Sequence, residues 1–156
     1  MMAPLVLVAL TVFVTGFPTP AQAQSQAESL PGAWREVEVE VMGGPNAGVT
    51  DVEENGSLWV FSDRYHSLNA VVPGQVRPDP SDDPTREERS RLFRTYVAFA
   101  GTWELEGSTL SLAAEVKLDP SAPDTLTREI TLTDTTLEAR TTEDGVVTAR
   151  RYVRVD

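Results

Sequence analysis

The chain alternates apolar and polar residues over one short run after another, and this period of two constrains its fold more than any other feature. The clearest run is EVEVEV, residues 36–41, which sets Val37, Val39 and Val41 on one face and three glutamates on the other. Similar runs recur to the end of the chain, separated by turn residues such as Glu-Asn-Gly and Glu-Asp-Gly. This is the pattern of half-buried antiparallel strands. We therefore expect an all-β domain of eight or nine strands.

So many strands in one small domain must manage the unpaired edges of their sheet, by closing into a barrel or by packing as a sandwich. The strands follow one another as hairpins with short turns, which favours an up-and-down antiparallel barrel. An eight-stranded barrel encloses only side chains or one small ligand. The residues that we place inward are Val37, Val39, Val60, Leu110, Leu112, Ala114, Ile130 and Leu132.

One stretch breaks the alternation and predicts a short helix. It runs over residues 84–93, and it is the only helix of more than two turns that we expect after residue 30. Asp83 can cap the helix, and Pro84 suits the first helical position. Two glutamates near the start and two arginines near the end complement the helix dipole. The helix is expected to lie over an opening or an edge of the barrel.

The first 23 residues carry no charged side chain. An apolar run leads into Pro-Thr-Pro-Ala-Gln-Ala, which ends in small residues at Ala21 and Ala23. This pattern is typical of a secretory signal peptide cleaved after Ala23, and the apolar run is shorter than the roughly 20 residues that span a bilayer. Since the chain has no Cys, a lipid-anchored lipoprotein is excluded.

These features divide the chain into three parts. Residues 1–23 form the signal peptide, residues 24–30 a flexible leader, and residues 31–156 the barrel domain. The mature protein is expected to be secreted or periplasmic, without stable membrane insertion.

The formal net charge of −11 at pH 7 narrows the range of partners. Phosphate repels so acidic a protein, and we therefore expect no nucleic-acid partner. Lys117 is the only lysine among the 13 basic residues. An acidic, arginine-biased surface fits both a protein that stays soluble at high salt and an ordinary acidic protein from a high-GC genome. The absence of Cys excludes disulfides, zinc-thiolate sites and cysteine nucleophiles.

The order of landmarks resembles the bacterial lipocalin-like domain family, relatives of the lipocalin (calycin-type) barrels. LPGAWREV is similar to that family's opening G-x-W strand, and YVAFAGTWELEGSTLSLAAEVKLDP to its central ribbon. TREITLTDTTLEA resembles the following strand pair, and TARRYVRV the closing strand that ends in arginine. The resemblance covers nearly all of residues 30–156. The matching positions are Gly32, Trp34, Tyr96, Ala98, Gly101, Thr102, Gly107, Thr109, Glu115, Pro120, Arg128, Leu132 and Leu137.

The resemblance implies that Trp34 packs at one end of the barrel beneath an arginine of the last strand, either Arg151 or Arg154. Simple alternation puts Trp34 in phase with Glu36 and out of phase with Val37, so this contact requires a bulge or bend near Arg35. The positions to which we assign structural roles are Gly32, Trp34, Gly101 and Arg154.

Histidine content limits the chemistry that we expect. Members of the family often carry histidine in the ribbon where this chain has Leu112 and Ala113. His66 is the only histidine, and no G-x-S-x-G motif accompanies it. We therefore expect no Ser-His-Asp hydrolase chemistry, no metal site and no cofactor, and we place His66 on the surface or at a strand end. No residue is assigned a catalytic role.

Two arginines are candidates for contact with a ligand. In simple alternation Arg128 shares a face with Ile130, and Arg151 shares one with Val153. An arginine on an apolar face must pair with a carboxylate, stack on an aromatic ring or meet an anionic ligand. Glu115 falls on the polar face of its strand. The full set of candidate ligand-binding residues is Arg128, Arg151, Tyr96, Phe99, Trp103 and Leu112.

The leading functional hypothesis is an exported protein that binds a small apolar or amphipathic molecule, such as a fatty acid, with Arg128 near its head group. One alternative is a barrel enzyme of the cyclase or isomerase type. The other is a packed structural or interaction barrel without a ligand. An interior cavity of about 300 Å³ or more would favour binding. The sequence leaves the ligand's identity and the oligomeric state open.

Overall fold

The computed structural model describes residues 27–52, 56–71 and 84–155. The signal peptide, its cleavage site and the cap predicted at Asp83 lie outside the described residues. One helical turn, residues 27–29, precedes the strands. The other elements in chain order are β1 (Gly32–Met42), β2 (Gly48–Asp51), β3 (Leu58–Phe61), β4 (Tyr65–Val71), α2 (Arg86–Arg94), β5 (Tyr96–Glu106), β6 (Thr109–Lys117), β7 (Thr125–Leu132), β8 (Thr136–Glu143) and β9 (Val146–Arg154).

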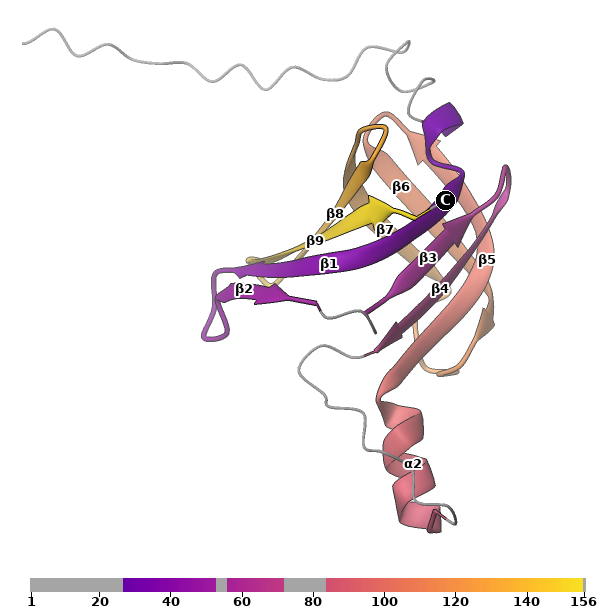
Figure 1. Cartoon of the computed structure of the whole chain (residues 1–156), viewed down its shortest axis with the longest axis vertical. Coiled ribbons are helices and arrows are strands. Elements are labelled where there is room, and N and C mark those ends of the chain that lie inside the picture. The colour runs from indigo at the N-terminus through magenta and orange to yellow at the C-terminus, as the bar shows by residue number, and fades with distance from the viewer. Residues whose placement is uncertain (1–26, 53–55, 72–83, 156) are drawn as a thin grey trace, which may run out of the picture.

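The strands form one antiparallel sheet in which sequence neighbours from β3 to β9 are also neighbours in space. Pairing of β1 with β9 closes this sheet into a barrel of eight strands, with β2 as an extra strand (Figure 1). The predicted all-β, up-and-down antiparallel barrel is confirmed. Closure removes the sheet edges that would otherwise stay unpaired in solvent.

Two short strands share one edge of β1. Residues 32–35 pair with β3, and residues 38–41 pair with β2. Ser57, just before β3, is buried, and its carbonyl accepts a hydrogen bond of 2.9 Å from the backbone N–H of Glu36. The break between β2 and β3 therefore brings a polar side chain against the middle of β1.

Trp34 lies at one end of the barrel, which we call the Trp34 end. Its indole N–H donates to the Leu30 carbonyl at 2.9 Å, and both side chains are fully buried. Residues 27–30, the described part of the predicted flexible leader, thus fold against the barrel, and the folded domain begins before residue 31. The opposite end, where α2 joins β5, is called the α2 end.

A bulge in β1 shifts the pairing with β9 between Glu36 and Glu38. Trp34 and Glu36 are buried on one side of the bulge, and Val39 is buried on the other, so the inward phase changes within the strand. The irregularity predicted near Arg35 is present, slightly further along the strand. Val37, which we expected to point inward from simple alternation, sits at the bulge.

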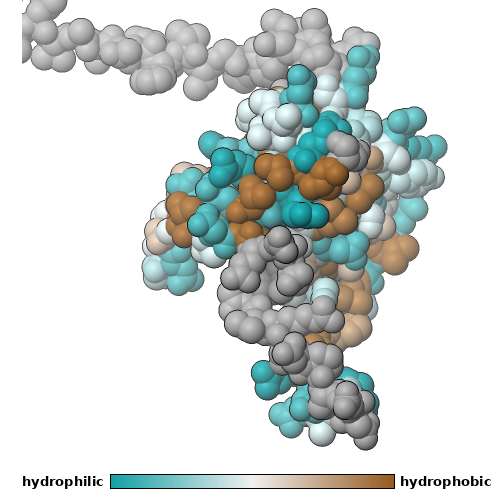
Figure 2. All heavy atoms as spheres, viewed as in Figure 1, coloured by the Kyte–Doolittle hydropathy of each residue, from teal (hydrophilic) through white to brown (hydrophobic). Residues whose placement is uncertain are grey.

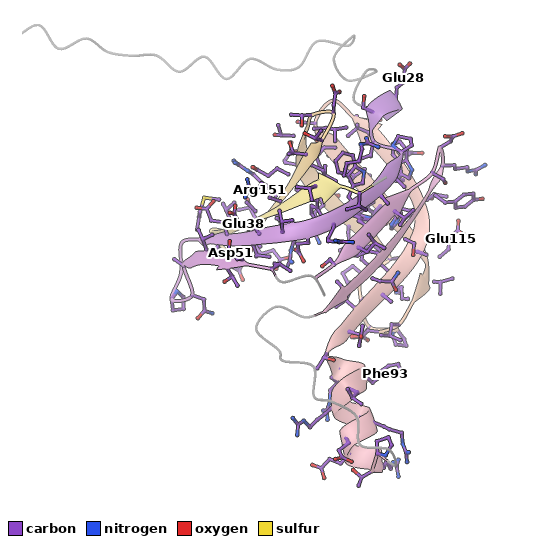
Figure 3. All side chains as sticks on the ribbon, in the orientation of Figure 1. Glu28, Glu38, Asp51, Phe93, Glu115 and Arg151 are labelled. Carbon is purple, nitrogen blue, oxygen red and sulfur yellow. The ribbon has the colours of Figure 1, made fainter. Side chains whose placement is uncertain are left out.

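A second bulge lies between β5 and β6, where the register shifts at Gly101. A Cβ atom on Gly101 would lie 1.8 Å from the Ala113 carbonyl oxygen, so this close approach requires glycine. Beyond the bulge Lys117 pairs with Phe99 and its side chain is largely buried. Glu115 stays exposed, as expected (Figure 3).

The core lies inside the barrel. Val60, which we placed inward, is 41% exposed, whereas Trp59 and Phe61 are buried. That prediction is wrong because the two aromatic rings of β3 bury far more apolar area than Leu58 and Val60 would. The core cluster consists of Leu30, Trp34, Trp59, Phe61, Leu110, Leu112, Ile130, Leu137, Ala139 and Tyr152.

Helix α2 is the only helix of more than two turns in the described part of the chain, as predicted, but it starts at Arg86 instead of Pro84. Thr85 is the N-cap, and it forms a capping box with Glu88 through bonds of 3.2 Å and 2.7 Å. The helix projects from the barrel and its surface is mainly hydrophilic (Figures 1 and 2). Among the described residues, no helix is long and apolar enough to cross a membrane.

Candidate functional site

The barrel interior contains an ion pair whose carboxylate is buried. Glu36 is 2% exposed, and its carboxylate accepts hydrogen bonds from the Arg150 guanidinium at 2.6 Å and from the Ser57 hydroxyl. We expected aliphatic walls with Arg128 as the one inward charge. That expectation is wrong because the bulge in β1 keeps Glu36 on the inward face together with Trp34. The interior is therefore polar as well as apolar.

Arg128 lies half-buried in β7, opposite the fully buried Leu110 of β6. Within the described residues it makes no ion pair, whereas the neighbouring Arg150 is held by Glu36. Burial lowers the pKa of Arg128, although Tyr152 and Glu143 partly oppose this effect. A half-buried cation without a direct carboxylate partner favours an anion beside it.

Tyr152 contributes a hydroxyl to the same region. Burial, and then the negative charge of Glu36, raise the pKa of Tyr152 far above its ordinary value of 10. Its ring packs on Trp59 with centroids 5.6 Å apart. The phenol therefore stays protonated at any physiological pH and can act as a hydrogen-bond donor.

Arg151 points out of the barrel, contrary to the prediction. Its side chain is 51% exposed and pairs with Glu38 at 3.0 Å on the outer surface (Figure 3). In β9 it is Arg150, Tyr152 and Arg154 that face inward, because Tyr152 is the residue that fills the core. Arg151 is not part of an interior site.

His66 lies near the start of β4, as the strand-end prediction had it, but it is 3% exposed and faces the barrel interior, so the predicted surface position is wrong. The rings of Trp59, Phe61 and Phe99 surround it at centroid distances of 6.5, 6.2 and 5.3 Å. Both imidazole nitrogens, and Nε1 of Trp59, are buried without a hydrogen-bond partner in the described structure. Burial lowers the pKa of His66, which keeps the imidazole neutral.

The ribbon residues proposed for ligand contact fall into two groups. Leu112 is buried in the core, and Trp103 donates its indole N–H to the Ser62 carbonyl at 2.9 Å, so both are held by the barrel itself. Phe99 packs against the core and contacts His66, while Tyr96 lies at the α2 end. Phe99 and Tyr96 border a pocket.

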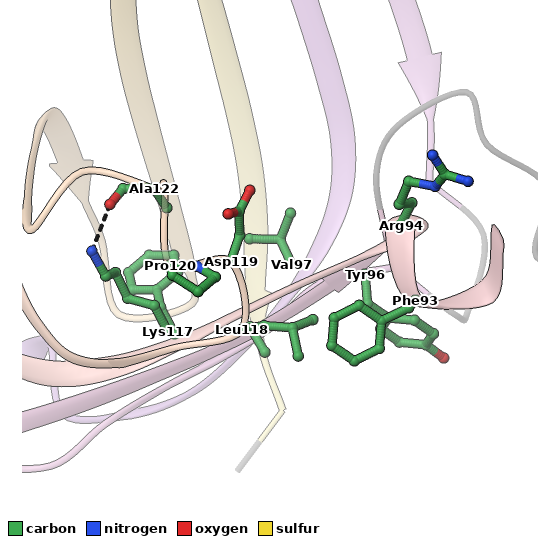
Figure 4. A pocket seen from close by; sticks show the side chains of 11 residues that line it. Phe93, Arg94, Tyr96, Val97, Lys117, Leu118, Asp119, Pro120 and Ala122 are labelled. Carbon is green, nitrogen blue, oxygen red and sulfur yellow. Dashed lines mark hydrogen bonds between the residues drawn. The ribbon is translucent and has the colours of Figure 1, made fainter. Parts of the chain in front are cut away.

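That pocket, of about 450 Å³, opens at the α2 end between α2, the start of β5 and the β6–β7 connection (Figure 4). Its polar rim includes Lys117, which donates to the Ala122 carbonyl at 2.6 Å and pairs with Asp124 at 2.6 Å. The lining is mainly apolar. The residues that line it are Phe93, Arg94, Tyr96, Val97, Ala98, Phe99, Lys117, Leu118, Asp119, Pro120 and Ala122.

Sequence reasoning did not select Glu36, Arg150, His66 or Trp59 as site residues. The phase of Glu36 with Trp34 was the available signal, since Trp34 was expected to be buried. Nothing in the alternation of β9 distinguishes the face of Arg150 from that of Arg151. No group of three His, Cys, Asp or Glu side chains that could hold a metal ion occurs in the described segments.

Comparisons with known proteins match no family model and no curated protein. Among solved structures, the chain is similar to an uncharacterized protein from Bacteroides eggerthii, with 14% identity and a TM-score of 0.48 over 81% of this chain and 99% of that one. It is also similar to a lipocalin-like protein from Bacteroides uniformis, with 14% identity and a TM-score of 0.46 over 79% of this chain and 97% of that one.

The fold assignment rests on the chain's own strand pairing. That pairing runs without interruption from β3 to β9 and closes through β1, which gives a closed eight-stranded antiparallel barrel, consistent with a lipocalin-like all-β fold. Membership of the bacterial lipocalin-like domain family stays a prediction from the sequence.

Proposed function

We propose that this protein binds a small amphipathic molecule with an anionic head group, and that the Arg128 guanidinium holds this head group inside the barrel. The single observation that carries the proposal is the inward position of Arg128 without an ion pair among the described residues. Its guanidinium presents several N–H donors, and a carboxylate can accept two of them at once.

The surroundings of Arg128 favour an amphipathic ligand over a purely polar one. Leu110 and Ile130 are buried beside it, so an apolar tail would gain dispersion contacts there. The neighbouring Arg150 adds positive potential, although Glu36 neutralises most of it at 2.6 Å. The Tyr152 hydroxyl, which stays protonated, offers the head group a further donor.

The test is a titration of the folded protein with dodecanoate and with dodecanol, which share a tail and differ in the head group. Dodecanoate is expected to bind with saturation and more tightly than dodecanol. Arg128→Met keeps most of the side-chain volume and removes the charge. It should weaken dodecanoate binding by at least about tenfold, since hydrogen bonds to charged groups contribute about 1.5–3 kcal/mol.

Arg151→Met is the matched control because it makes the same chemical change on the outer surface of the barrel. It should leave dodecanoate affinity within about twofold of the wild type, as surface substitutions do. If both variants weakened dodecanoate binding equally, the loss of affinity would follow from the change in net charge alone. That result would contradict the proposal. The absence of any dodecanoate binding would favour the packed barrel without a ligand.

Export belongs to the same proposal. A protein that carries an amphipathic molecule outside the cytoplasm would need the signal peptide that residues 1–23 resemble. Mass analysis of the exported protein should give Gln24 as its first residue. An intact Met1 would contradict cleavage.

A further inference from the structure

Three buried polar atoms inside the barrel lack a partner in the described structure: both imidazole nitrogens of His66 and Nε1 of Trp59. Buried polar groups in proteins are nearly always hydrogen-bonded, so a group left unpaired calls for an explanation. We propose that His66 and Trp59 form the polar end of a second binding site, whose apolar body is the pocket at the α2 end, and that this site takes an uncharged planar molecule carrying a hydroxyl or carbonyl group.

Phe99 connects the two parts of this site. Its side chain lines the pocket of about 450 Å³, and its ring meets the His66 ring edge-on with centroids 5.3 Å apart. A ligand in the pocket is therefore one side chain away from the imidazole. Since His66 is 3% exposed, the ligand reaches it only when the Phe99 ring turns aside.

The residues around His66 define the class of ligand. A neutral imidazole offers one donor and one acceptor, and the indole N–H of Trp59 offers a second donor. A hydroxyl group on the ligand can donate to the acceptor nitrogen of His66 and accept from one of the two N–H donors. Burial lowers the pKa of His66, and none of the ion pairs among the described residues includes it, so this polar end favours an uncharged group of the ligand. The rings of Trp59, Phe61 and Phe99 favour a flat aromatic body, which can stack on them or meet them edge-on.

This site rests on the proposed function only in that both treat the chain as a small-molecule binder. The atoms differ, since Arg128 lies on β7 and His66 on β4. The two proposals are tested with different probes, so that dodecanoate can fail while the present site stands, or the reverse.

The experiment compares 2-naphthol with naphthalene, which differ by one hydroxyl group. Because His66 is the only histidine, its Hε1 proton gives a single imidazole Hε1 signal by NMR, which needs no further assignment. We expect 2-naphthol to bind with saturation, to shift this signal and to bind about tenfold more tightly than naphthalene, which corresponds to about 1.4 kcal/mol. Equal affinities, or binding of 2-naphthol that leaves the His66 signal unchanged, would overturn the proposal.

Two substitutions locate the hydroxyl subsite. His66→Phe keeps a ring and removes both nitrogens, so it should abolish the preference for 2-naphthol while naphthalene still binds. Trp59→Phe should reduce that preference. Trp103→Phe is the control, because it also removes an indole N–H, but one already used by the Ser62 carbonyl. A preference that survives His66→Phe, or that Trp103→Phe lowers equally, would contradict the assignment.

A third substitution keeps the test decisive if His66→Phe fails to fold. Phe99→Leu shortens the side chain between the pocket and His66 without introducing a polar group. It should change the affinity of both naphthalene probes and expose the His66 signal to solvent, because the pocket then extends to the imidazole. Unchanged affinities and an unchanged His66 signal would mean that Phe99 does not join the two parts, and would overturn the site.

Discussion

The guanidinium of Arg154 lies over the ring of Trp34, with its central carbon 4.3 Å from the ring centroid. The same guanidinium donates hydrogen bonds to the carbonyls of Pro31 and Asp134, each at 3.0 Å, and to that of Ser29. One side chain thus ties the first strand, the last strand and the β7–β8 turn together at the Trp34 end. The contact predicted for Trp34 is confirmed, with Arg154 as the partner.

Replacing Trp34 with alanine should destabilise the protein by about 3–5 kcal/mol, the range for truncating a buried aromatic ring. The indole is fully buried, it donates to Leu30 at 2.9 Å and it carries the Arg154 stack. Chemical denaturation followed by circular dichroism measures the change in unfolding free energy. Trp34→Phe, which keeps an aromatic ring, should lose less unfolding free energy than Trp34→Ala. A loss below about 1 kcal/mol for Trp34→Ala would mean that the ring is not held as described.

Removing Arg150 should cost more than removing the ion pair as a whole. Arg150→Met leaves the Glu36 carboxylate, which is 2% exposed, with Ser57 as its remaining partner, and such an uncompensated charge costs about 3–5 kcal/mol. The double variant Glu36→Leu with Arg150→Met should be more stable than Arg150→Met alone. Denaturation midpoints of the three proteins at one pH test this order.

The control for this cycle is Arg151→Met, which breaks the exposed pair with Glu38. Surface pairs contribute about 0–1 kcal/mol, so this variant should stay close to the wild type. If Arg150→Met and Arg151→Met were equally stable, the Glu36 pair would not be buried in solution.

Stability should fall in mildly acidic solution because of His66. Burial holds its pKa in the folded protein below the ordinary value of 6.5. The unfolded chain therefore binds the proton first as the pH drops, and the free energy of unfolding decreases between about pH 6.5 and the lower folded pKa. Above this interval the imidazole is neutral in both states, and His66 contributes no pH dependence.

His66→Phe isolates this effect from the titration of the many carboxylates. The difference in unfolding free energy between wild type and variant should shift in favour of the variant from about pH 8 to about pH 5. The His66 NMR signal should titrate with a midpoint below 6.5. A parallel pH profile for the two proteins would contradict a buried imidazole.

Alternation predicted the barrel because each strand has to bury one face, and that requirement is local. It did not decide which face turns inward. In β3 it is Trp59 and Phe61 that face inward instead of Val60, because the two aromatic side chains bury more apolar area. In β9 Tyr152 faces inward, and Arg150, two positions earlier, therefore shares the inward face while Arg151 faces solvent.

The positions of the two bulges could not be predicted from the local pattern of residues for a different reason. The shift between Glu36 and Glu38 satisfies the pairing of β1 with β9, a strand more than a hundred residues away (114 positions separate Glu36 and Arg150). The contact required of Trp34 did indicate such a shift in β1. No comparable signal in the sequence indicated the bulge at Gly101. That bulge places the Lys117 side chain on the same face of the sheet as Phe99.

The burial of His66 was missed because a lone histidine is usually a surface residue. The available signal was Leu68, which lies two positions further on the same face of β4 and packs against the core. The surroundings of His66 come from β3 and β5, which pair with β4 on either side. A site assembled across three strands has no local signature in the sequence.

Closure of the barrel through β1 and β9 has a consequence for the order of folding. The first strand gains its partner along most of its length only when the last strand is in place, so a large share of the stabilising contacts is non-local. Chains rich in such contacts fold slowly, because the entropy of closing long loops is lost before the contacts form. A chain that is still being synthesised could therefore close its barrel only after β9 has been made.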